Sequence, residues 1–482
     1  MAAGMIRPRA AGAADPAPPE TRLDTIPVGD VPAAGATLEL PAPADLLGLS
    51  WDGDPGAHIR LRFRGAGGRW SPWVSAGSRG HGPEGAANTA RTVGEPIWTG
   101  GASAVQVMAH TPLAGVEVHI VDVSAGAGAR SNTAHAASLA LAKPAIDAGA
   151  GQPPIIARRA WALGISPPRV APEYGSVRMA FVHHTENPNG YGAGEVPAML
   201  RAIYAFHVYT NGWNDIGYNF VIDLYGRIFE ARAGGIQEAV TGAHAGGYNY
   251  VSTGVSVLGT FSYVPISPAA RGALQSLLAW KLPLHGVPAQ GTIAVRVDPS
   301  GAQYSKYPGN DRVLLPRIAG HRDGDSTECP GDVLYGELPS IRPVVRRLAG
   351  NGARLTLVLG AQVPGAPAAE PGGTGAPSTS TPAAAAPAQQ TLEGTLTLPT
   401  GAPVAGAAVI VQSRTVARRG EAVTETTLAE VQTGAEGQWS ALVPVPAAPA
   451  PAQHLRALFP GGSGLGATVS EGLTLNAPAA VN

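Results

Sequence analysis

The chain has 482 residues, of which 14% are charged, and its 33 Lys and Arg residues nearly balance its 34 Asp and Glu residues. This length predicts two to four domains with buried cores, and the charge balance provides no basic surface for nucleic acid. A single cysteine excludes an internal disulfide framework, and no apolar run approaches the roughly 18 residues that span a bilayer.

The N-terminal part predicts a β-domain. Residues 1–22 combine Arg, Ala, Gly and Pro without an apolar stretch, so we expect them to be disordered and to carry no visible export signal. Residues 23–124 contain short apolar runs with a period near two, which predicts a β-sandwich with strands at 36–40, 57–63, 104–108 and 116–121. Four tryptophans either pack in its core or form an aromatic platform for carbohydrate: Trp51, Trp70, Trp73 and Trp98.

The middle of the chain predicts an α/β domain. Residues 125–154 are rich in Ala, Gly and Ser and predict a linker, in which 133–143 could form a short helix. Residues 155–350 contain strands that alternate with helices, which predicts a mixed central β-sheet flanked by helices. The expected strands are 177–184, 215–223, 227–230, 254–261 and 313–318, and the expected helices are 196–211, 268–282 (ending before Pro283) and 338–349.

The C-terminal part predicts a second accessory domain. Residues 351–390 are rich in Pro, Ala, Gly, Ser and Thr, which predicts a semi-extended linker. Residues 391–482 return to β character, with runs at 394–398, 408–411, 439–443 and 454–459 that predict a small β-sandwich. The chain is thus expected to place one α/β domain between two β-sandwich-like domains.

The single cysteine points to a metal. Cys329 lies in a polar loop, eight positions after His321. A lone thiol is more often an inert core residue, but a thiolate in an exposed loop needs a positive partner, which a metal can provide. Cys and His together favour Zn²⁺, and a catalytic zinc has three protein ligands and an open fourth position. The spacing therefore predicts a zinc site whose third ligand lies elsewhere.

Five segments of the middle domain, in their order, resemble the peptidoglycan recognition protein family, which includes the zinc N-acetylmuramoyl-L-alanine amidases. They are residues 181–185 (FVHHT), 212–220 (GWNDIGYNF), 242–249 (GAHAGGYN), 254–259 (GVSVLG) and 321–331 (HRDGDSTECPG). The resemblance covers about residues 155–350. It implies a secreted or wall-associated zinc hydrolase that cuts the amide between N-acetylmuramic acid and the L-alanine of the peptidoglycan stem peptide.

The resemblance assigns the metal ligands to His183, His321 and Cys329. His184 follows His183 on a strand, and successive strand residues face opposite ways, so His184 is left out of the ligand set.

Two further residues match catalytic positions of the family. Tyr218 would orient the attacking water or relay its proton, although an unperturbed phenol has a pKa near 10 and is a poor base; a purely packed aromatic is the alternative. Thr327 would stabilise the oxyanion together with the zinc.

The family's substrate groove matches a further set of positions. His244 and Asn249 are predicted to bind substrate, with a structural turn as the alternative. Gly212 and Trp213 match the residue pair that, in members of the family, accompanies a preference for meso-diaminopimelate over lysine in the stem peptide. The segment 288–316 is longer than in compact members, as it often is in bacterial ones, and its effect on the groove stays open.

Two other functions stay open. The chain could hold muropeptide without cutting it, although the retained Cys329 favours an enzyme, or the flanking β-domains could carry the main function as adhesion modules. We also expect a monomer whose residues 155–350 fold and cut without either flanking domain. That expectation assumes that no groove residue comes from the N-terminal β-domain.

Overall fold

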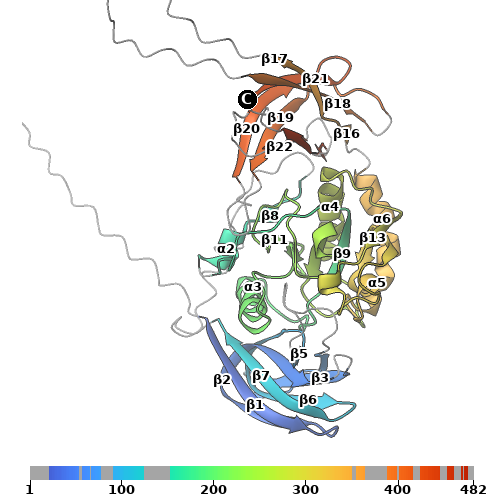
Figure 1. Ribbon diagram of the computed structural model, residues 1–482. Helices are drawn as coiled ribbons and strands as arrows, with labels where there is room; N and C mark the ends of the chain where they lie inside the picture. Colours follow the sequence, from blue (N-terminus) through green and yellow to red (C-terminus); the bar gives the residue numbers. More distant parts are fainter. Residues whose placement is uncertain are drawn as a thin grey trace, which may run out of the picture.

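The computed structural model describes residues 21–53, 57–65, 67–76, 91–123, 152–164, 166–349, 354–363, 388–398, 401–415, 424–445, 453–460, 468–470 and 472–475. The predicted disorder of residues 1–22 lies almost wholly outside these ranges, as do the linker at 125–154 and its short helix. In Figure 1 the α/β domain lies between the N-terminal β-domain, in blue, and the C-terminal β-domain, in orange and red.

The N-terminal domain is one antiparallel sheet of seven strands. They are β1 (Arg22–Val31), β2 (Ala36–Asp52), β3 (Ile59–Arg64), β4 (Val74–Ser75), β5 (Arg91–Val93), β6 (Ile97–Ala109) and β7 (Leu113–Asp122). The order is β1-β7-β2-β6-β3-β4, with β5 beside β2. The β character agrees with the prediction, but the strands form a single hydrogen-bonded sheet rather than two. Shifts in register between Glu39 and Ala44 let the long strand β2 bend.

The four tryptophans of this domain divide between two environments. Trp51 is fully buried in the core, and Trp98 is 7% exposed at the boundary with the α/β domain. Trp70 and Trp73 are only half-buried, and the guanidinium of Arg62 lies 5.1 Å and 4.8 Å from their ring centroids. Core packing therefore accounts for two of the four rings.

The α/β domain is built on a mixed sheet, as the sequence predicts. Its strands are β8 (Ile155–Ile156), β9 (Met179–His184), β10 (Phe220–Ile222), β11 (Ile228–Glu230), β12 (Ser252–Val257) and β15 (Ile318–Gly320), in the order β15-β9-β12-β10-β11-β8. Only β10 and β11 are antiparallel neighbours; the other pairs are parallel. A separate hairpin joins β13 (Thr292–Arg296) to β14 (Arg312–Pro316).

Helices cover both faces of this sheet. They are α2 (Arg158–Ala162), α3 (Val196–Ala205), the π-helix η1 (Phe206–Thr210) that continues α3, the 3₁₀ turns η2 (Asn249–Val251) and η3 (Pro299–Gly301), α4 (Pro268–Leu284), α5 (His321–Gly324) and α6 (Asp332–Ala349). The hydroxyl of Ser267 caps α4 by accepting from the amide of Ala270 (3.0 Å). The helix continues through Pro283 to Leu284, beyond its predicted end, because a proline in the last turn removes one donor while buried leucines hold that turn.

The C-terminal domain is a sandwich of two antiparallel sheets. One sheet contains β16 (Arg354–Leu355), β17 (Val358–Val363), β18 (Gln389–Thr397) and β21 (Gln438–Pro444); the other contains β19 (Ala408–Thr415), β20 (Thr424–Gln432), β22 (Gln453–Phe459), β23 (Thr468–Val469) and β24 (Leu473–Leu475). Strands β16 and β17 correct the prediction of a linker across residues 351–390. Both pair with β18, and Leu355 and Leu357 are buried in the sandwich core.

The three domains share hydrophobic cores. Leu46 and Trp98 of the N-terminal domain belong to the same buried cluster as Met199 and Leu200 of α3. A Cβ on Gly48 would lie 2.0 Å from the ring of Phe206, so strand β2 directly contacts the start of η1, where α3 ends.

The C-terminal domain adds Leu458 to the main α/β cluster. Arg456 also pairs with Glu238 across this boundary at 2.9 Å. The domains therefore pack as one unit, and no helix in the part of the chain described above is long and apolar enough to cross a membrane.

Candidate metal centre

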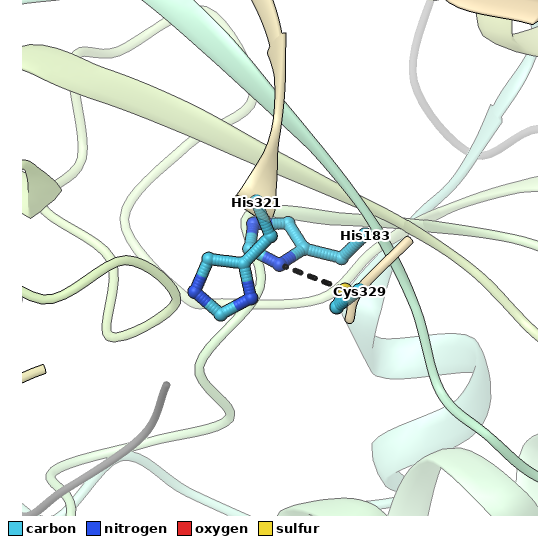
Figure 2. Close-up of side chains that lie close together, drawn as sticks. All are labelled: His183, His321 and Cys329. Atoms are coloured by element: carbon cyan, nitrogen blue, oxygen red, sulfur yellow. Dashed lines mark hydrogen bonds between the residues drawn. The ribbon is translucent and has the colours of Figure 1, made fainter. Parts of the chain in front are cut away.

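Two neighbouring parallel strands bring the predicted histidines together. Strands β15 and β9 are adjacent, so their carboxyl ends meet at one edge of the sheet. His183 lies near the end of β9, and His321 is the first residue after β15. The loop after α5 folds back, and the amide of Arg322 donates to the carbonyl of Cys329 (2.9 Å). All three predicted ligands are buried, and their ligand atoms lie within 4.8 Å of one another (Figure 2).

The second nitrogen of each imidazole is held by a neighbouring side chain. His183 Nε2 is 3.1 Å from His244 Nδ1, and His321 Nε2 is 2.9 Å from Asp325 Oδ2. Each histidine would therefore bind a metal through Nδ1. The Nδ1 atom of His183 lies 3.8 Å from Cys329 Sγ. Such outer partners fix the orientation and tautomer of metal-binding histidines. The donor set fits a single zinc ion with an open fourth position.

Burial disfavours charge on His321 and Cys329 when no cation is bound. Burial lowers the pKa of His321 well below its usual value, so the ring is neutral and able to bind a metal. Burial likewise raises the pKa of the Cys329 thiol, although the amide of His184 hydrogen-bonds to the sulfur and opposes this. A metal ligand must be a thiolate, so binding of a cation would release the thiol proton.

His184 points away from the cluster, as strand alternation predicts. Its Nε2 lies 3.2 Å from Glu186 Oε1, and its Nδ1 accepts from the amide of Phe261 (3.4 Å). The preceding residue of β9 on the same face, Val182, belongs to the core beneath α4 and α6, whereas His183 lies on the opposite face with Phe181.

Tyr218 lies against the cluster. Its ring centroid is 5.4 Å from that of His183 and 5.8 Å from that of His207, which η1 supplies and which accepts from the amide of Gly217 (3.1 Å). Burial raises the pKa of the Tyr218 phenol well above its usual value, and the carboxylate of Glu95 raises it further. The hydroxyl stays protonated at neutral pH, so it can donate a proton or hydrogen bond but is not a base.

Thr327 hydrogen-bonds to the backbone of the cysteine. Its Oγ1 accepts from the amide of Cys329 (3.1 Å), and its side chain lines a cavity. The hydroxyl hydrogen is thus directed away from that amide and can donate to a ligand in the cavity.

The four predicted substrate-binding residues do not line this cavity. His244 is fully buried behind His183, and a Cβ on Gly242 or Gly254 would lie 2.4 Å or 2.3 Å from its ring. Asn249 accepts from the amides of His244 and Ala245 and so closes the turn. The geometry of both residues suits the support of His183 better than contact with substrate.

The other two predicted residues lie at the end of η1. Trp213 is 1% exposed and packs on His207, with ring centroids 4.4 Å apart. Gly212 is exposed at a φ of +75°, and its carbonyl accepts from Arg169 (3.3 Å). This pair shapes the loop that leads to Tyr218, so an influence on the stem peptide stays a prediction.

A cavity of about 550 Å³ opens beside Cys329 and Thr327. One wall comes from the α/β domain and includes His184 and Glu186; the other comes from the N-terminal domain and includes Glu95. The expectation that residues 155–350 cut alone assumes that no groove residue comes from the N-terminal β-domain, and it stays a prediction, although residues of that domain line this cavity.

Sequence reasoning missed three residues of this region. The spacing of four between His321 and Asp325 was a usable signal, since i and i+4 share a helix face. No local pattern marks Glu95 or Glu186, which only the packing of two domains brings to one cavity.

The fold and the cluster define the class of protein: a mixed α/β domain with a His/His/Cys set able to hold one metal ion beside a cavity. Residues 173–332 match the family described as N-acetylmuramoyl-L-alanine amidase. Residues 11–139 match the family described as Rv3811 N-terminal galactose-binding domain-like.

Individual relatives agree with this class. Peptidoglycan-recognition protein SC1a/b of Drosophila simulans is 30% identical over 159 residues, which are 33% of this chain and 70% of that protein. N-acetylmuramoyl-L-alanine amidase of Sus scrofa is 29% identical over 225 residues, 44% of this chain and 33% of the relative. Among solved structures, wild-type Drosophila PGRP-LB is similar with 26% identity and a TM-score of 0.30, covering 39% of this chain and 92% of that one. The chain belongs to the family of peptidoglycan recognition proteins and N-acetylmuramoyl-L-alanine amidases, which confirms the resemblance drawn from its motifs.

Proposed function

We propose that the protein is a zinc-dependent N-acetylmuramoyl-L-alanine amidase that acts on peptidoglycan outside the cell or in its wall. The observation that carries the proposal is the position of Cys329. It completes the His183 and His321 cluster, and it also lines the cavity, so a metal held there would face a bound substrate. A structural zinc site normally has four protein ligands, and only these three residues gather within the described parts of the chain.

The chemistry can be assigned to residues around the cavity. A zinc ion at this site would supply a water molecule whose pKa lies near 7. Thr327 donates its hydroxyl hydrogen toward the carbonyl oxygen of the scissile amide, since its oxygen already accepts from the Cys329 amide. Tyr218, protonated and beside His183, donates a hydrogen bond that orients the reacting groups. Asp325 and His244 keep the two histidine rings in place.

The substrate follows from the family. The reaction would cleave the amide between the lactyl group of N-acetylmuramic acid and L-alanine, and a preference for meso-diaminopimelate in the stem peptide is proposed on the resemblance of Gly212 and Trp213 alone. Peptidoglycan recognition proteins are among the relatives, so a recognition protein that binds muropeptide without cutting it is the competing function.

Mass spectrometry of purified sacculi after incubation with the full chain tests the proposal. We expect peptides with a free L-alanine amino group and glycan with intact lactyl carboxyl groups. A chelator should abolish these products, and added zinc should restore them. The Cys329→Ser variant is the matched control and should release nothing. Binding to sacculi with no new amino termini, with zinc present, would instead identify a recognition protein.

A further inference from the structure

The cavity beside the metal centre has a second wall that the amidase family match does not include. That match spans residues 173–332, whereas His58, Trp73, Glu95 and His110 line the cavity from the N-terminal domain. The two walls are held together by the hydrophobic cluster shared between that domain and α3. The N-terminal wall is therefore a fixed part of the site rather than a tethered neighbour.

Glu186 on the α/β wall is built to meet a ligand. It is 7% exposed and has a φ of +54°, a conformation that costs a non-glycine residue energy and occurs often at functional sites. Its Oε1 lies 3.2 Å from His184, but its buried Oε2 has no hydrogen-bond partner among the described residues. A buried carboxylate oxygen without a partner is costly, and a donor from a ligand in the cavity would satisfy it.

Glu95 on the N-terminal wall presents a second carboxyl group to the same space. It lies between β5 and β6, and burial raises its pKa well above the usual value, with a further rise from the charge of Glu186. Both residues line the cavity, so their carboxyl groups can hydrogen-bond to a ligand that is rich in O–H and N–H groups.

Trp73 gives the N-terminal wall an apolar surface. The ring lines the cavity, is half-buried, and is held by the guanidinium of Arg62, 4.8 Å from its centroid. An aromatic ring beside carboxyl groups suits a sugar, whose C–H face is apolar and whose rim carries hydroxyl groups. Arg60 and Lys306 also line the cavity and offset the acidic charge, which disfavours a simple site for an ammonium group.

We propose that the N-terminal domain forms the sugar side of the substrate site, with the N-acetylmuramic acid residue lying against Trp73 and donating hydrogen bonds to Glu95 and Glu186. The stem peptide then extends from the lactyl group past Cys329 and Thr327. This assignment rests on the proposed amidase function for the identity of the sugar. It makes the N-terminal domain a determinant of specificity, beyond any role in attachment to the wall.

Calorimetric titration of the full chain with N-acetylmuramic acid tests the assignment without relying on turnover. We expect Trp73→Ala and Glu95→Leu each to weaken binding of the sugar about tenfold, the size of a lost hydrogen bond or aromatic contact. Trp70→Ala is the matched control, because Trp70 also contacts Arg62 but is not part of the cavity wall. It should bind within about twofold of the parent, and circular dichroism establishes that each variant is folded.

A second measurement compares kcat/KM for a muramyl dipeptide and for the same dipeptide carrying only a D-lactoyl group. The ratio of the first kcat/KM to the second should fall in Trp73→Ala and Glu95→Leu and stay at the parent value in Trp70→Ala. Parent-like sugar affinity in both cavity variants overturns the proposal. The proposal is also overturned if the two cavity variants keep their affinity for the sugar but lose affinity for diaminopimelate, because the cavity would then be a cation site. Sugar binding that depends on Trp73 in a protein that cuts no sacculi would refute the amidase function and leave the sugar site standing.

Discussion

Asp325 provides the sharpest test of the metal centre, because it acts only through one ligand. Its Oδ2 accepts from the amide of Gly246 (2.7 Å) and lies 2.9 Å from His321 Nε2. The side chain is fully buried, so both contacts are made without competition from water. Burial also raises the pKa of the Asp325 carboxyl group well above its usual value, although the amide of Gly246 opposes this. The variant Asp325→Asn keeps the size of the side chain but can never become a carboxylate when a cation binds.

The expected size of the effect follows from these contacts. The carbonyl oxygen of an asparagine can replace Oδ2, but its amide group then occupies the place of Oδ1. That atom is buried and makes no hydrogen bond to any described residue, so two amide hydrogens would lack acceptors. Changes of this kind typically weaken metal binding 10- to 100-fold, which is about 1.4 to 2.7 kcal/mol.

Competition with a chromogenic chelator measures zinc affinity in the parent and the variant. Asp332→Asn is the matched control, because Asp332 is exposed, pairs with Arg322 and contacts no predicted ligand. We expect the control to match the parent. An Asp325→Asn affinity within twofold of the parent would refute the view that this carboxylate holds His321 for the metal.

Cys329→Ser should lose the one zinc ion expected per chain, which elemental analysis measures; full occupancy would remove Cys329 from the ligand set. Tyr218→Phe should keep metal and fold but lower the rate of muropeptide cleavage by about 10² to 10⁴, and parent-like turnover would assign the ring to packing. Burial lowers the pKa of Lys281 to about 7. Above that pH the lysine is neutral in the folded chain but still protonated in the unfolded chain, which therefore binds more protons. The free energy of unfolding in urea should then rise by about 2 kcal/mol between pH 7 and 9 and lose this slope in Lys281→Met. A fragment of residues 155–350 exposes the cluster shared with the N-terminal domain and should melt below the full chain; an equal melting temperature would show that the domains are independent.

The gathering of His183, His321 and Cys329 could be predicted from the sequence because it depends on residue type and strand alternation. Cys329 stands out as the single thiol, and the order of five motifs identified the family. The opposite orientation of His183 and His184 follows from the geometry of any strand. The apolar period of α4 predicted its buried leucines in the same way, since the helix packs one face on the sheet.

The prediction failed where a segment was grouped with its neighbours or judged by residue type alone. Residues 354–363 carry Leu355, Leu357 and Leu359 in alternation, a strand pattern that differs from the Pro-rich run after Val363. The segment pairs with β18 because Leu355 and Leu357 fill the core of the C-terminal sandwich. Likewise, His244 has the residue type of a ligand-binding group, but the close approach of Gly242 and Gly254 places it behind His183.

The composition of the cavity was decided by the tertiary structure alone. Glu95 and Glu186 are separated by 91 positions and belong to different domains, and no periodicity in either segment refers to the other. They meet because Leu46 and Trp98 pack on α3, which sets the N-terminal sheet beside the metal ligands. The sequence by itself determines which residues can bind a metal, since that is a property of single side chains and local repeats. Which residues line the cavity depends on how two hydrophobic surfaces pack together, and this is a property of the whole chain.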